Sequence, residues 1–130
     1  MKRLTVPALC LMLAAWALPA FADPGHQMTG QKSTSRTITG ELVDTGCYLG
    51  HGARGEKHVS CATKCLQQGM PMGLLTSNGT LYLVTLDHDN ADPYNSLKDM
   101  AGKTVSVTGE VLSRSGMKAI EASAVRVASK

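Results

Sequence analysis

Apolar and polar positions alternate in several stretches of the chain, and this alternation is typical of half-buried β-strands. In residues 36–44, Ile38 and Leu42 fall on one side, while polar residues fall on the other. Residues 103–112 alternate in the same way, and Val107 lies on their apolar side. Five strands are predicted from this pattern: Arg36–Asp44, Met72–Thr76, Thr80–Leu86, Lys103–Leu112 and Met117–Ala128.

Turn residues and glycines indicate how these strands are connected and bent. The dipeptide Asn78-Gly79 lies between two apolar runs, which is a strong signal for a tight β-hairpin. Gly40 and Gly109 fall in mid-strand, as expected where a sheet curls into a barrel. In the last strand, Ala124 is in phase with the inward residues before it but Val125 is not, which predicts a bulge near Ala124.

Two short helices are predicted between the strands. The segment 58–69 (HVSCATKCLQQG) has helical spacing and ends at Gly69, a residue type favoured just past a helix C-terminus. A second helix is expected over Tyr94–Met100, with Asp92 as its N-cap and Pro93 in its first turn.

The order of these elements predicts a mainly β fold, a five-stranded OB-like barrel. In such a barrel a helix connects the third and fourth strands, as the Tyr94–Met100 helix does here. The cysteine-bearing helix is then an insertion between strands one and two. A sheet of six or more strands, or an open sandwich, is the alternative.

The N-terminal segment predicts export. A basic Met1-Lys2-Arg3, an apolar run over residues 4–18 and the small-x-small sequence Ala20-Phe21-Ala22 form a signal peptide spanning residues 1–22. Residues 23–35 are polar and rich in Gly and Ser, which predicts a disordered linker, and residues 36–130 form the barrel domain. A periplasmic or secreted location is expected, with no membrane association after cleavage.

Removal of the signal peptide changes the charge and the cysteine count. Without Lys2 and Arg3, 11 basic residues remain against 10 acidic ones, a net charge near +1. This balance gives no basis for binding nucleic acid. Cys10 is also lost, which leaves Cys47, Cys61 and Cys65. An odd number of cysteines is unusual in an exported protein, whose thiols normally pair.

The remaining cysteines and one histidine form a candidate metal site. His58, Cys61 and Cys65 are spaced by three and four residues, so they project from one side of the predicted helix. Cys47 reaches them from the end of the first strand through a glycine-rich loop. Thiolates and imidazole bind copper(I) or zinc, so a Cys3His set is predicted, and the function expected from it is metal binding or delivery.

Other donors near this site favour copper. Met70 and Met72 follow the cysteine helix directly, and thioether sulfur in an oxidising compartment suits copper better than zinc. His51 and His88 are alternative ligands, ranked below the main set because a loop histidine is usually solvated. No nucleophile or acid–base pair lies in a recognisable catalytic context, so an enzyme is not expected. A protein partner in the periplasm is a further expectation.

Two other interpretations of the cysteines remain open. A disulfide from Cys47 to Cys61 or Cys65 would fasten the loop to the helix and stabilise the fold by roughly 3 kcal/mol. The chain would then be a disulfide-stapled binding module for a protein or small molecule. Alternatively, Cys61 near the helix N-terminus would have redox activity as a thiolate.

Much of the chain resembles a known family. The segments ELVDTGCYLGHGARGEKHVSCATKC, GMPMGLLT and GKTVSVTGEV are similar to those of a family of small, mostly uncharacterised exported bacterial proteins. The resemblance covers about residues 37–127. It implies the barrel and the exported location, and it carries over no activity.

Overall fold

The computed structural model describes residues 34–128 of the chain. The predicted signal peptide and nearly all of the predicted linker lie outside these residues. Ser35, predicted to lie in the linker, is instead the first residue of a strand. Within the described residues, no helix has the length and apolar character needed to cross a membrane.

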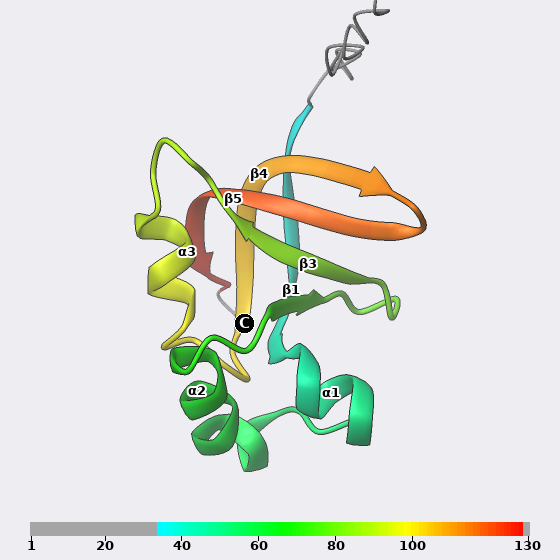
Figure 1. Ribbon diagram of the computed structural model, residues 1–130, viewed down its shortest axis with the longest axis vertical. Coiled ribbons are helices and arrows are strands. Elements are labelled where there is room, and N and C mark those ends of the chain that lie inside the picture. Colours follow the sequence, from blue (N-terminus) through cyan, green and yellow to red (C-terminus); the bar gives the residue numbers. More distant parts are fainter. Residues whose placement is uncertain (1–33, 129–130) are drawn as a thin grey trace, which may run out of the picture.

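The five predicted strands are present and form a closed barrel (Figure 1). Around the barrel the order is β1-β2-β3-β5-β4, and β4 pairs with β1 to complete the closure. All neighbouring strands are antiparallel except β3 and β5. The fold is therefore the predicted five-stranded OB-like barrel. The strands are β1 (Ser35–Asp44), β2 (Met72–Leu75), β3 (Leu81–Leu86), β4 (Thr104–Arg114) and β5 (Met117–Val127).

The predicted bulge in β5 is confirmed, although one residue there was placed on the wrong side. Thr108 pairs with Ala124 and Gly109 with Ala122, so one extra residue is accommodated in β5. Ala124 is exposed, not inward as predicted, because the bulge reverses the alternation, and Val125 packs against the core instead. A Cβ at Gly109 would overlap the backbone carbonyl of Glu121, which explains the glycine at this bend.

Gly40 lies where β1 gains its second neighbour. Residues 35–41 of β1 pair with β4, whereas pairing with β2 begins at Glu41. A Cβ on Gly40 would lie 2.6 Å from the carbonyl oxygen of Leu75, so only glycine allows β2 to approach β1 this closely.

The core fills the barrel and extends to the helix that covers one of its ends. Val105 and Val107 of β4 are fully buried, as the alternation predicts. The buried cluster consists of Leu42, Ala62, Leu66, Met72, Leu74, Val84, Leu97, Ala101, Val105, Val107, Ile120 and Ala122. Ala62 and Leu66 come from the cysteine helix, so this helix is part of the folded core.

Two helical segments and a short 3-10 turn separate β1 from β2. They are α1 (Thr45–His51), η1 (Glu56–His58) and α2 (Val59–Gln67). The predicted cysteine helix corresponds to η1 and α2 together. The prediction that Cys47 lies at the end of the first strand is wrong, because Cys47 lies in α1. The glycine-rich loop between it and the cysteine helix is reduced to residues 52–55. In Figure 1, α1 and α2 lie side by side below the barrel.

The helix α3 (Asp92–Leu97) lies between β3 and β4, as expected for this fold. Its boundaries differ from the prediction. Ala91 is the N-cap, and Asp92 lies in the first turn without a side-chain capping bond. The helix also ends at Leu97, before the predicted Met100, where the fully buried Leu97 side chain anchors it to the core.

Candidate metal centre

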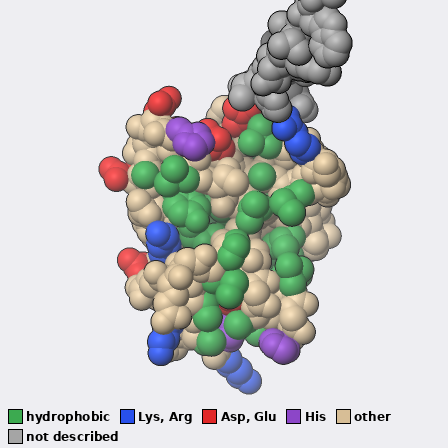
Figure 2. Space-filling view, in the orientation of Figure 1, with side chains coloured by type: hydrophobic (Ala, Val, Ile, Leu, Met, Phe, Trp, Pro, Cys, Tyr) green, Lys and Arg blue, Asp and Glu red, His purple; other side chains and the backbone are tan. Residues whose placement is uncertain are grey.

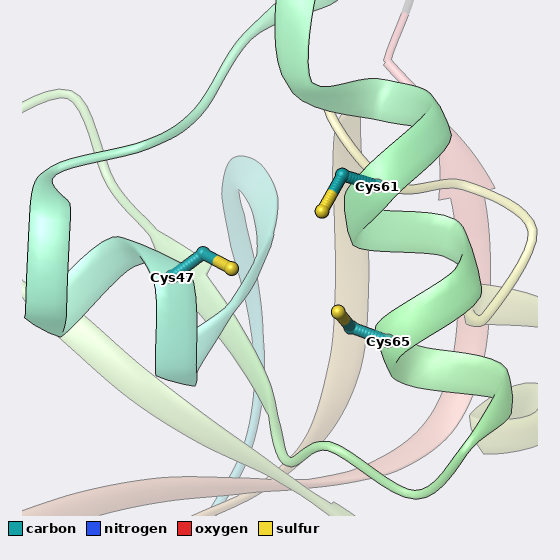
Figure 3. Close-up of side chains that lie close together, drawn as sticks. All are labelled: Cys47, Cys61 and Cys65. Atoms are coloured by element: carbon teal, nitrogen blue, oxygen red, sulfur yellow. The ribbon is translucent and has the colours of Figure 1, made fainter.

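Three thiols from two helices converge at the lower end of the molecule. Cys47 projects from α1 toward Cys61 and Cys65, which project from successive turns of α2 (Figure 3). The three Sγ atoms all lie within 4.8 Å of one another. All three are free thiols, so the structure does not support the alternative in which Cys47 is bonded to Cys61 or Cys65.

The orientation of Cys47 depends on Asp44, the last residue of β1. An oxygen of Asp44 accepts a hydrogen bond from the Cys47 backbone N–H at 2.8 Å and thereby caps α1. Gly52 ends this helix in a left-handed conformation, at φ 65°. These two ends fix a helix of only seven residues, and Cys47 lies in its first turn.

Cys61 and Cys65 are positioned by the buried side of α2. Ala62 and Leu66 are the next residues along the helix and are buried in the core, which fixes the rotation of α2 about its axis. Cys61 is therefore exposed and Cys65 half-buried. The thiol cluster lies at the boundary between core and solvent, and it is open to solvent at Cys61.

His58 is not part of the cluster of three thiols. It belongs to a second group of possible ligands, and the two groups have Cys47 in common. Its Nε2 lies 3.1 Å from Oδ2 of Asp44. Ligand atoms of Asp44, Cys47 and His58 all lie within 4.8 Å of one another. The predicted set of one histidine and three cysteines is thus not a single cluster: it is divided into two groups that have Cys47 in common.

Asp44 is the residue of the site that sequence reasoning missed. It is the one charged side chain that is fully buried among residues 34–128. Burial of a carboxylate is costly unless it is paired, and here one oxygen caps α1 while the other faces His58. The signal in the sequence was an aspartate three residues before Cys47, which is the spacing of an N-cap.

The four lower-ranked candidate ligands are two methionines, Met70 and Met72, and two histidines, His51 and His88. Met72 is buried in the barrel core, where it pairs across the sheet with Asp44. Met70 is partly exposed, and its sulfur would lie 2.7 Å from a Cβ at Gly46. His51 is exposed at the end of α1 and His88 is exposed after β3. Neither histidine belongs to the two groups found in the described residues.

Two of the thiols hold their protons more tightly than usual. A hydrogen bond to Asp44, followed by burial and the nearby negative charges, raises the pKa of Cys47 from 9.0 to about 12. Burial and contact with Cys61 raise the pKa of Cys65. Both are therefore protonated at neutral pH, which argues against their acting as redox nucleophiles. A metal ion would have to displace these protons.

The raised pKa of Cys47 predicts how the stability of the metal-free protein depends on pH. Between pH 9.0 and about 12 the thiol of the unfolded chain loses its proton while the folded chain keeps it. The folded state then binds more protons, so stability falls as the pH rises. We expect the urea midpoint to decrease more steeply above pH 9 for wild type than for Cys47→Ser. Parallel slopes would contradict this assignment.

The segment that carries the thiols is itself basic. The segment 45–71 contains Arg54, Lys57 and Lys64 against a single acidic residue, Glu56. Figure 2 shows Lys, Arg and His side chains at the lower end of the molecule and acidic ones mainly toward the upper left. The charges that act on the Cys47 and Cys65 thiols are nevertheless negative and come from Asp44 and the other thiols.

Comparison with known proteins adds no assignment, since no family model, curated protein or solved structure matches this chain.

Proposed function

We propose that this chain is an exported protein that binds a soft metal ion, copper(I) in preference to zinc, for metal binding or delivery. The observation that carries the proposal is the convergence of three free thiols from two helices, with sulfur atoms within 4.8 Å of one another. Export rests on the signal-peptide pattern of residues 1–22.

The sulfur positions are close to those that a metal site needs. With metal–sulfur bonds of about 2.3 Å, the sulfurs of a trigonal or tetrahedral site lie about 3.8–4.0 Å apart. Sulfurs that already lie within 4.8 Å can reach this separation by small side-chain rotations. The helices themselves do not have to move.

The chemistry of the thiol group favours copper(I). The cluster of Cys47, Cys61 and Cys65 offers only sulfur ligands, and soft thiolate ligands select copper(I). Zinc accepts the same ligands but usually takes a fourth. Because Cys61 is exposed, an incoming ligand can reach the metal from solvent, which suits transfer to another molecule better than permanent storage.

Titration of the reduced protein tests the proposal. Residues 23–130 would be titrated without oxygen, with copper(I) and separately with zinc, in competition with chelators of known affinity. We expect one copper(I) ion per chain, bound far more tightly than micromolar and more tightly than zinc, with protons released on binding. If neither metal binds better than micromolar, the proposal fails.

A binding module is the second candidate, and one cavity favours it. About 680 Å³ of open space lies between β1, the end of α1 and the β2–β3 turn. Glu41 and Arg54 line this cavity, and their charged atoms lie 4.0 Å apart. Its lining mixes polar and apolar groups, and its size suits a small molecule. The metal titration also discriminates between the candidates, because a module that binds a small molecule in this cavity needs none of the three thiols.

A further inference from the structure

The two groups of ligand atoms differ in chemistry although they share a residue. The first offers three sulfurs, from Cys47, Cys61 and Cys65, while the second offers the oxygen of Asp44, the nitrogen of His58 and again the sulfur of Cys47. A soft ion prefers the first group, whereas a borderline ion such as zinc accepts oxygen, nitrogen and sulfur together. The shared thiol lies between them.

The separation of Asp44 and His58 is a few tenths of an ångström shorter than that of two neighbouring ligands on one metal ion, so His58 would have to turn outward slightly to accept one. Zinc binds carboxylate oxygen and histidine nitrogen at about 2.0–2.2 Å, which places the two ligand atoms roughly 3.3–3.5 Å apart in a tetrahedral site. In this protein Nε2 of His58 and Oδ2 of Asp44 lie 3.1 Å apart. The cation would take the place of the hydrogen shared by these two atoms.

Asp44 can bind a metal without giving up its structural role. One oxygen accepts the Cys47 N–H bond that caps α1, and the other is the oxygen that faces His58. The carboxylate is fully buried, so it would be held in one orientation. His58, by contrast, is half-buried at the start of α2, and it provides the side of this group nearer to solvent.

We propose that Asp44, Cys47 and His58 form a second metal position, for zinc or a similar divalent cation, and that the Cys47 thiolate bridges it to the copper(I) position. This inference rests on the proposed function, because it requires the cluster of three thiols to bind copper(I). Three protein ligands leave a fourth zinc position for water. The neutral imidazole would bind through Nε2 and carry its single proton on Nδ1, so a proton held on Nε2 in the metal-free protein moves to Nδ1 through solvent. The proton released to solvent is that of the Cys47 thiol.

The expected result is a protein with two different metal ions. Wild type would be loaded with one equivalent of copper(I), exposed to excess zinc, freed of loose metal and measured by native mass spectrometry. We expect one copper and one zinc per chain. X-ray absorption at the zinc edge should show nitrogen or oxygen neighbours together with sulfur.

Substitutions separate the two positions. In His58→Ala and in Asp44→Asn we expect copper to be retained and zinc affinity to fall more than about 100-fold, because a direct ligand is lost. Asparagine keeps an oxygen that can cap α1. His51→Ala is the matched control, since His51 is exposed in the neighbouring helix and belongs to neither group; it should retain both metals.

Each outcome decides between the inference and the function on which it rests. A total of one metal ion per chain, or an all-sulfur shell around zinc, would overturn the second position and leave the thiol site intact. Unchanged zinc binding in His58→Ala would also overturn it, and this variant decides the matter if Asp44→Asn does not fold. Wild type without any bound metal would refute both proposals.

Discussion

Replacing Val107 by aspartate is expected to leave the chain unfolded. Val107 is fully buried in β4, between Ile38 of β1 and Val125 of β5. An unpaired carboxylate at this position loses its hydration and finds no partner, a cost of several kcal/mol. That cost is comparable with the whole stability of a small domain, about 5–15 kcal/mol. Circular dichroism and an amide NMR spectrum would show the loss of the sheet.

The control for this change is Ser113→Asp, which adds the same charge to an exposed position of the same strand. It should fold normally and lose less than about 0.5 kcal/mol. If Val107→Asp remained folded with a native spectrum, the inward face of β4 would be assigned incorrectly.

Replacing Cys61 by serine is expected to remove most of the copper(I) affinity and to leave the fold unchanged. The substitution takes away one of three thiolates, and a hydroxyl is a poor ligand for a soft ion. Changes to groups that only support ligands cost about 10–100-fold in metal affinity, so loss of a direct ligand should cost more than about 100-fold. Competition with a copper(I) chelator measures this change.

Cys61 is the most informative of the three cysteines because it is exposed. Its replacement removes no buried contact, so the thermal midpoint of the metal-free protein should stay the same. Ser60→Ala is the matched control, at the exposed position before it on α2, and it should bind copper(I) like wild type. Equal affinities in Cys61→Ser and wild type would remove Cys61 from the site.

The barrel was predictable because its signals are local. Alternation placed Val105 and Val107 inside, and the change of phase near Ala124 located the bulge. The helix α1 was not predictable in this way. Its sequence TGCYLGH contains two glycines, each of which costs about 1 kcal/mol in a helix interior relative to alanine. It forms because the ends are fixed by Asp44 and Gly52, and neither effect appears in the hydrophobic pattern.

The convergence of the three thiols was predictable from the sequence, whereas the buried Asp44 beside them was not. Spacing alone brings Cys61 and Cys65 to one side of a helix, and their converging on Cys47 is confirmed. Spacing also grouped His58 with them, but the contact with Asp44 places it in a different set of ligands. That contact joins residues from separate segments, and burial of a carboxylate at the end of a strand depends on the tertiary fold.

The insertion that carries the site begins and ends at neighbouring positions of the sheet. Asp44 at the end of β1 and Met72 at the start of β2 are paired neighbours in the sheet, so residues 45–71 form an excursion whose length does not affect strand register. The inner side of α2 closes the barrel with Leu66, while its outer side presents Cys61. Substitutions on the outer side of α2 can therefore change the side chains around the thiols without altering the core, whereas those on its inner side cannot.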